Sequence, residues 1–180
     1  LKYLYLNTKQ TSEFTIPVIK GVTTVKISTC GKVGQSGAII GTGLYIKTLA
    51  AAGSGTITLY NSGNDFDNVI LASLNATGAS AVASAIAYQD SDGFALTQDG
   101  SFLPTTLGGI CSAGVVTLAC GATDKNGMST AGVTQTGAVT GNGSLLVLGS
   151  GPYTLGSSDN KINNFSGNVT GGAVALADSA

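Results

Sequence analysis

The stretch AIIGTGLYIKTLAAAGSGTITLY, residues 38–60, contains the pattern that decides the fold class. Two runs rich in Ile, Leu, Thr and Tyr, at 38–47 and 55–60, flank a segment of alanines and glycines. Short runs of β-branched and aromatic residues that are bounded by glycine-rich turns are typical of β-strands. The stretch therefore predicts two strands with a turn between them.

The same pattern recurs along the chain at intervals of about ten residues. Gly, Asn, Asp and Ser gather in the intervening segments, as they do in β-turns. Short strands with this regular spacing predict an all-β protein, an immunoglobulin-like or jelly-roll-like β-sandwich. The expected strands are at 14–19, 22–29, 38–47, 55–60, 68–74, 94–98, 115–120, 132–139, 144–148 and 172–177.

One segment, ASAVASAIAY at 79–88, fits two structures. Val82 and Ile86 have the spacing of one helical face, whereas alternation places both of them on one face of a strand and alanines on the other. We expect a strand, because an all-alanine face lets a second layer of the protein approach closely.

The N-terminal residues form an unusual segment for a chain end. A run that is apolar on both faces of a strand opens the chain: Leu1, Lys2, Tyr3, Leu4, Tyr5 and Leu6. Chain ends are usually polar and frayed unless they are held by other elements, so this strand is expected to dock. It docks either in its own domain or on the open sheet edge of a neighbouring subunit. We expect a donor strand and tether at 1–12 and a single domain at 13–180.

The composition argues against several classes of function. In 180 residues the chain has eight lysines, no arginine, nine acidic residues, and neither His nor Trp. The few basic residues argue against a nucleic-acid partner, because phosphate binding needs clustered Lys and Arg. The lack of His removes the Ser-His-Asp and Cys-His arrangements and the usual general base. We therefore expect no enzyme, no catalytic residues and no cofactor.

Two acidic segments, DFD at 65–67 and DSDG at 90–93, are the candidates for a cation site. Neither has the complete EF-hand pattern with its terminal Glu. We expect these carboxylates to be solvated turn residues, and we assign no metal site.

Several features favour a secreted protein. The chain starts at Leu1, which we interpret as the result of signal-peptide removal. No apolar run approaches the roughly eighteen residues of a membrane helix, so no membrane span is expected. Four Asn-x-Ser/Thr sequons are candidates for N-glycosylation, although ordinary turn chemistry is the alternative. These sequons are at Asn75, Asn142, Asn164 and Asn168.

Three cysteines, Cys30, Cys111 and Cys120, are the disulfide candidates. Cys111 and Cys120 are offset in the expected hairpin, and a bridge requires Cα atoms within about 7 Å. A bridge from Cys30 to one of the other two is therefore favoured. The alternative is three buried thiols that pack as small hydrophobic side chains.

Taken together, the apolar N-terminal strand on a polar tether, the all-β body, the sequons and the few charges resemble a family of archaeal extracellular filament subunits, the thread pilins of Sulfolobales. The resemblance covers the whole chain as a plan and rests on composition and layout. It implies a head-to-tail homopolymer of identical subunits on the cell surface, joined by donor-strand complementation and carrying N-linked glycans. Adhesion or cell–cell contact is the implied role.

Two other classes share these features. One is a viral capsid or surface-layer β-sandwich, and the other is a carbohydrate-binding adhesin module. The scarcity of charge also leads us to expect stability in acid, because few paired carboxylates can lose their stabilising contribution as the pH falls.

Overall fold

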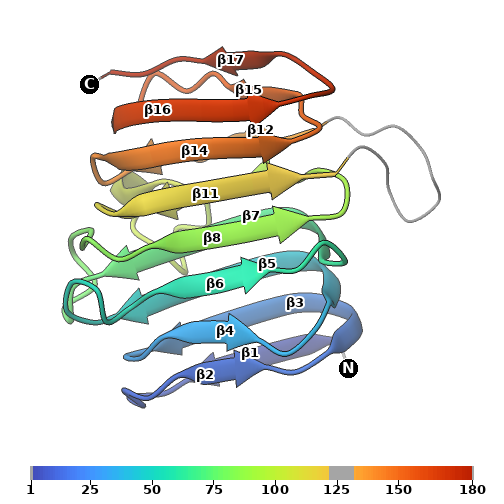
Figure 1. Cartoon of the computed structure of the whole chain (residues 1–180). Coiled ribbons are helices and arrows are strands. Elements are labelled where there is room, and N and C mark those ends of the chain that lie inside the picture. Colours follow the sequence, from blue (N-terminus) through green and yellow to red (C-terminus); the bar gives the residue numbers. More distant parts are fainter. Residues whose placement is uncertain (1, 122–131, 180) are drawn as a thin grey trace.

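The computed structural model describes residues 2–121 and 132–179. In these residues the chain winds as a solenoid, in which successive coils lay strands in two large sheets and stack on one another (Figure 1). Every pairing between named strands in the described residues is parallel. The first coils lie at the bottom of Figure 1 and the last coils at the top.

The strands pair in the order in which the coils follow one another. Sheet A runs through β1 (Tyr3–Asn7), β3 (Ile19–Thr29), β5 (Ile39–Leu49), β7 (Asp65–Leu74), β10 (Ile110–Cys111) and β13 (Val139–Thr140), with β9 (Ala95–Leu96) and β12 (Thr134–Gln135) beside this path. Sheet B runs through β2 (Phe14–Ile16), β4 (Val33–Gln35), β6 (Ile57–Tyr60), β8 (Ile86–Asp90), β11 (Val115–Cys120), β14 (Gly143–Gly149) and β16 (Ile162–Val169). A small further sheet joins β15 (Tyr153–Leu155) to β17 (Val174–Leu176).

The all-β class predicted from the sequence is confirmed, but the expected immunoglobulin-like or jelly-roll-like sandwich is replaced by a parallel β-solenoid. Those sandwiches pair their strands antiparallel. Here β3 and β5 lie side by side in parallel because the chain passes through β4 in the other sheet between them. Apolar and polar residues alternate in the same way in both arrangements. The pattern therefore predicts where the strands are but not which strands pair.

Several expected strands differ locally from the structure; the one at 14–19, for example, ends at Ile16, and Ile19 already belongs to β3. In the 79–88 segment only its last part is a strand, because β8 begins at Ile86. The expected strand at 132–139 is divided between β12 and β13, since the chain turns a corner near Gly137. A Cβ at Gly137 would collide with the carbonyl of Thr97, so this corner requires a glycine.

Ladders of stacked side chains fill the space between the sheets. Within sheet B, the five inner members of one ladder are at most 2% exposed, and burial of each such side chain contributes about 1.5–3 kcal/mol. That ladder consists of Phe14, Val33, Ile57, Ile86, Val116, Leu145 and Phe165. Its counterpart in sheet A consists of Leu6, Ile27, Ile46, Leu71, Ile110 and Val139.

At one corner of the solenoid, a buried asparagine side chain makes hydrogen bonds with the backbone of three successive coils. The Oδ1 atom of Asn64 accepts the backbone N–H of Ile39, at 3.1 Å, from the preceding coil. Its Nδ2 atom donates to the carbonyls of Leu59 in the same coil and Gln89 in the next, each at 3.0 Å. The side chain thus satisfies backbone groups at the corner, where strand pairing is interrupted.

A second corner near the other end of the stack is built in the same way. The Oδ1 atom of Asn160 accepts the N–H of Val139 at 2.8 Å, and its Nδ2 atom donates to the carbonyls of Leu155 and Ala177 at 3.1 and 2.7 Å. Both corners belong to an internal repeat, VGQSGAIIG at 33–41 and VTQTGAVTG at 133–141. The repeat therefore encodes a structural unit of the solenoid.

The insertion at 97–109 folds over the outer face of sheet A. It carries one turn of 3₁₀ helix, η1 (Thr105–Leu107), and the buried side chains Phe102 and Leu103. These two pack on outward-facing residues of β7 and β10, including Ile70, to form a second hydrophobic cluster. The outer face of sheet A is therefore covered over the middle coils and open over the first ones.

Candidate functional site

Both ends of the stack are open in the described part of the chain. At the bottom of Figure 1, β1 pairs only with β3 and β2 only with β4. At the top, β16 pairs only with β14 and β17 only with β15. Each end therefore presents unpaired strand edges, which are templates for the addition of a further strand.

The last strand of sheet B exposes a side chain that belongs to the core. Phe165 is in register with Leu145, which is 1% exposed, but Phe165 itself is 43% exposed. The rest of β16 is also exposed, apart from its two terminal residues Ile162 and Val169. Within the described residues no further strand covers β16, so the ladder ends there with an exposed aromatic ring.

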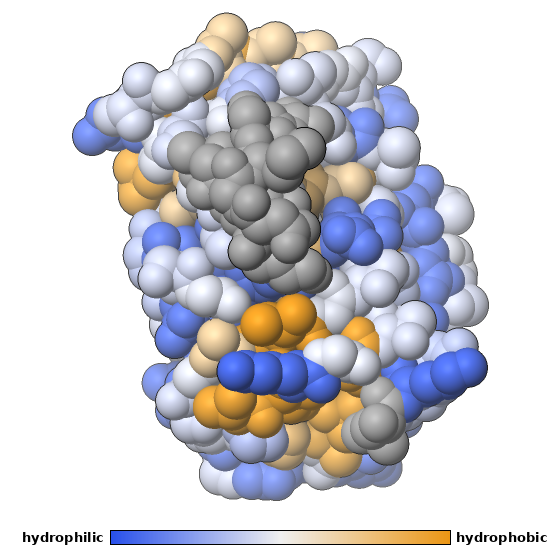
Figure 2. Space-filling view, turned by 90° about the vertical axis from the view of Figure 1, so that its right-hand side faces the viewer, coloured by the Kyte–Doolittle hydropathy of each residue, from blue (hydrophilic) through white to orange (hydrophobic). Residues whose placement is uncertain are grey.

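The first coil presents a matching apolar edge. Leu4, Leu6 and Phe14 face the core and are only partly buried. On the outer face, the rings of Tyr3 and Tyr5 stack at 5.8 Å between centroids and are 50% and 62% exposed. Figure 2 shows hydrophobic surface gathered in the lower half of one side of the solenoid, above a bottom edge that is mostly white and blue.

The predicted donor segment docks within its own chain. From Tyr3 to Asn7 it forms β1, in parallel register with Thr24 to Ser28 of β3, and the carbonyl of Lys2 accepts the backbone N–H of Thr23 at 2.7 Å. Leu1 lies outside the described residues. Of the two expectations for this strand, the structure contains the intramolecular one, and donation to a neighbour stays a prediction.

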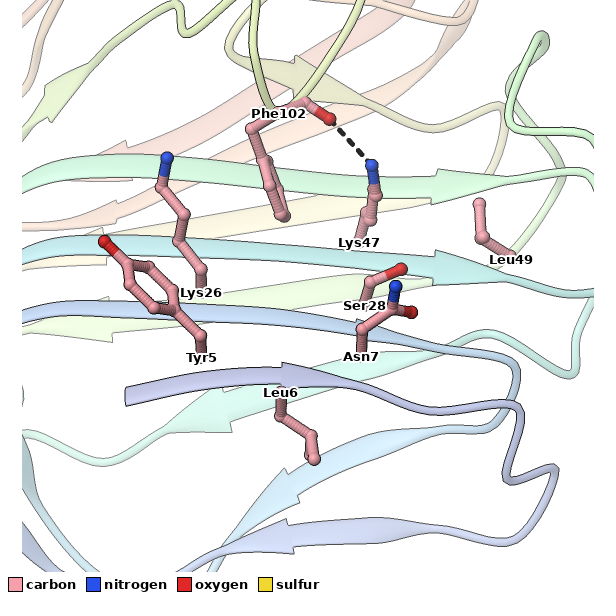
Figure 3. A pocket seen from close by; sticks show the side chains of 8 residues that line it. All are labelled: Tyr5, Leu6, Asn7, Lys26, Ser28, Lys47, Leu49 and Phe102. Atoms are coloured by element: carbon pink, nitrogen blue, oxygen red, sulfur yellow. Dashed lines mark hydrogen bonds between the residues drawn. The ribbon is translucent and has the colours of Figure 1, made fainter. Parts of the chain in front are cut away.

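A groove of about 460 Å³ runs over the outer face of the first coils of sheet A (Figure 3). Its floor carries two rows of side chains across the strands, one containing Tyr5 and Lys26 and the other containing Asn7, Ser28 and Lys47. The wall is Phe102 from the insertion at 97–109. In Figure 3 the lysines and Tyr5 stand on the groove side of the sheet, and Leu6 points the opposite way.

The two lysines in this groove differ in their partners. Lys26 donates to Asp99 at 2.7 Å, and this contact holds the pKa of Asp99 well below its usual range, at about 2. The Lys47 ammonium donates to the carbonyl of Phe102 at 2.8 Å and lies 4.7 Å from the centroid of its ring. Burial lowers the pKa of Lys47. Within the described residues Lys47 has no carboxylate partner, so its charge is uncompensated.

One acidic residue that we expected in a solvated turn is buried instead. Asp90 is 1% exposed at the end of β8. It accepts hydrogen bonds from the hydroxyl of Tyr88 and from the backbone N–H of Phe66, the latter at 3.1 Å. Burial raises the pKa of Asp90 to about 8. The expectation of solvated turn carboxylates is therefore wrong for Asp90, whose carboxyl group is part of the packed corner.

The predicted disulfide is absent. Cys30, Cys111 and Cys120 are free thiols, of which the last two are buried. Cys111 lies in β10 of sheet A and Cys120 in β11 of sheet B, so they are not partners in a hairpin. Burial raises the pKa of both of these thiols. The alternative of buried thiols that pack as hydrophobic side chains describes these two correctly.

The asparagines of the four sequons differ in solvent exposure. Asn142, Asn164 and Asn168 are exposed. Asn75 is half-buried, and its Oδ1 atom accepts hydrogen bonds from the hydroxyl of Thr77 and the N–H of Ala79 at 2.9 and 3.0 Å. Three sequons are therefore accessible in the folded chain, whereas the Asn75 side chain stabilises a turn through its hydrogen bonds.

The described residues contain no group of three or more metal-ligating side chains close enough to hold an ion. In the same residues no helix has the length and hydrophobicity needed to cross a membrane. Comparisons of the chain with protein-family models, curated proteins and solved structures found no match.

Proposed function

We propose that the chain is a non-enzymatic structural subunit of an extracellular filament, in which copies stack head to tail through the open ends of the solenoid. The observation that carries the proposal is the exposed end of the core ladder at Phe165. A second copy would place its first coil on this end, with Phe14 above Phe165. The ladder would then continue from one copy into the next without a change of register.

The direction of the strands determines the type of assembly. Because all strands are parallel, the edge formed by β16 and β17 is complementary to the edge formed by β1 and β2 and not to itself. A copy turned about a two-fold axis would bring its strands in antiparallel and break the ladders. A heterologous contact between the two ends that does not close produces a fibre.

The stacking contact has a favourable physical basis. Removing apolar surface from water contributes about 25 cal/mol per Å², and Phe165, Leu4 and Leu6 all have such surface left. Each new backbone hydrogen bond between edges adds about 0.5–1.5 kcal/mol. These gains must exceed the entropy of association, so assembly should depend strongly on concentration.

The proposal keeps the head-to-tail filament that the resemblance to thread pilins implies, but the contact between neighbouring subunits is different. The N-terminal strand β1 is presented at the edge of its own coil, and the neighbour adds to it edge to edge. The exposed sequons at Asn142, Asn164 and Asn168 support an extracellular setting for this filament.

The test compares two substitutions of exposed hydrophobic residues. Phe165→Asp places a charge on the open end, and Val115→Asp is the matched control, because Val115 is 50% exposed on β11 within the stack. We expect fibres from the wild type and from Val115→Asp, and folded monomers from Phe165→Asp, in negative-stain images and sedimentation velocity. Wild-type protein that stays monomeric at every concentration, or unchanged fibres from Phe165→Asp, would overturn the proposal.

A further inference from the structure

We propose that the groove on the outer face of sheet A binds an acidic saccharide, through Tyr5, Asn7, Ser28 and Lys47. This site adds a ligand-binding activity to the proposed structural role. Tyr5 and Asn7 lie on β1, the strand to which a neighbouring copy would add, but their side chains stand on the outer face of the sheet, so edge-to-edge stacking leaves them accessible. Its volume, about 460 Å³, falls within the range of about 300–1,000 Å³ that is usual for small-ligand sites.

The cationic group in the groove calls for an anion. Lys47 is partly buried, and its ammonium donates to the carbonyl of Phe102 and lies 4.7 Å from the centroid of its ring, with no carboxylate partner among the described residues. A charge withdrawn from water without an opposite charge is costly, and a ligand carboxylate would supply that charge in a charge-assisted hydrogen bond. Lys26 beside it is already neutralised by Asp99.

Next to Lys47 in the same row are groups suited to sugar hydroxyls. Asn7 is in register with Ser28, and Ser28 is in register with Lys47 on the next strand. The side chains of Asn7 and Ser28 are close together in Figure 3 and make no hydrogen bond within the described residues. An amide and a hydroxyl together supply both donors and acceptors, as the hydroxyl groups of a sugar require.

The aromatic edge of the groove supplies the apolar surface. Tyr5 is 62% exposed, and its ring is held nearly parallel to that of Tyr3, with 10° between the planes. Exposed tyrosine rings combine apolar faces with a polar tip. The CH face of one pyranose ring can pack on such a face while the carboxylate of another sugar unit of the same saccharide points to Lys47. A planar aromatic surface, neutral polar groups and one unpaired cation together favour an acidic sugar over a simple anion.

The probe for this site is a trimer of galacturonic acid, and its methyl ester is the uncharged ligand of the same shape. Calorimetric titration of the wild type should detect the acid and show at least about tenfold weaker binding of the ester, the loss expected for one charge-assisted hydrogen bond. Binding should also weaken as salt is raised. Absence of binding, or equal affinity for acid and ester, would overturn the proposal.

Variants assign the binding to this groove. Lys47→Gln should weaken binding about tenfold and Tyr5→Ala about two- to tenfold, and Lys32→Gln, which removes an exposed lysine elsewhere, should bind as the wild type does. Tyr5 is so exposed that its substitution leaves the fold intact, which thermal melting will verify. Wild-type affinity in both groove variants would overturn the assignment. Titration of the monomeric Phe165→Asp variant separates this result from assembly, since the groove should bind equally well without fibres.

Discussion

Phe14 and Phe165 lie at opposite ends of one ladder of core side chains in sheet B. Between them the ladder is closed to solvent, whereas Phe14 is half-buried and Phe165 is 43% exposed. The two aromatic side chains therefore mark the same structural position on the two faces that would meet in a head-to-tail stack. This relationship predicts the spacing of copies along the proposed stack, which can be measured.

Fibres of this protein should give the diffraction of stacked parallel strands. Neighbouring strands are about 4.8 Å apart, so the seven strands of sheet B in the described residues span about 34 Å per copy. Aligned fibres should show a meridional reflection at about 4.8 Å, because the strands cross the fibre axis. A fibre pattern without that reflection would contradict axial stacking.

The free energy of unfolding should fall as the pH rises from about 4 to 8. Asp90 has a pKa of about 8 in the folded protein and about 4 in an unfolded chain. Between these values the folded state holds a proton that the unfolded state has released, so rising pH favours unfolding, by on the order of a few kcal/mol. Asp90→Asn should flatten this slope in urea titrations at several pH values. Wild-type stability that rises between pH 4 and 8 would contradict the assignment.

The Asp99 carboxylate acts in the opposite direction in strong acid. Its hydrogen bond with Lys26 lowers the pKa to about 2, so its contribution is lost as the pH falls from about 4 to 2. We expect the highest melting temperature near pH 4 and little loss at pH 3. A melting temperature that collapses between neutral pH and pH 3 would reject the expected stability in acid.

Replacing a corner asparagine should destabilise the solenoid. Asn64→Ala leaves buried backbone groups of Ile39, Leu59 and Gln89 without partners, at about 1–3 kcal/mol for each group. We expect a loss of about 3 kcal/mol or more in urea unfolding. Asn61→Ala is the control in the same corner, since the Asn61 side chain accepts the N–H of Gly63, and loss of this one bond should cost about 1 kcal/mol or less. Equal losses in the two variants would contradict the role of Asn64.

The cysteines should behave as free thiols of unequal reactivity. Cys30 is half-buried, whereas Cys111 and Cys120 are buried and burial raises their pKa values. Thiolate is the reactive form, so a thiol reagent should label Cys30 first and the other two only after unfolding. A melting temperature that falls on addition of a reductant would indicate a disulfide and contradict the structure.

The strand positions were predictable from local pattern because strand-forming side chains and turn residues are local properties. The expected strand at 115–120 coincides with β11, and that at 144–148 lies within β14. The internal repeat at 33–41 and 133–141 was an available signal for a solenoid, since repeated segments stack. The interpretation as a sandwich did not use it, and the corner roles of Asn64 and Asn160 were therefore missed.

Local composition accounts for the all-β class and the absence of His chemistry, and it also located the apolar strand at the start of the chain. Which strands pair, and in which direction, depends on contacts between residues far apart in the sequence, such as Ile46 with Leu71. The burial of Asp90, the separation of Cys111 from Cys120, and the groove between β1 and Phe102 all arise from stacking of coils. Burial and proximity are properties of the folded chain, because they depend on what the other coils place around each side chain.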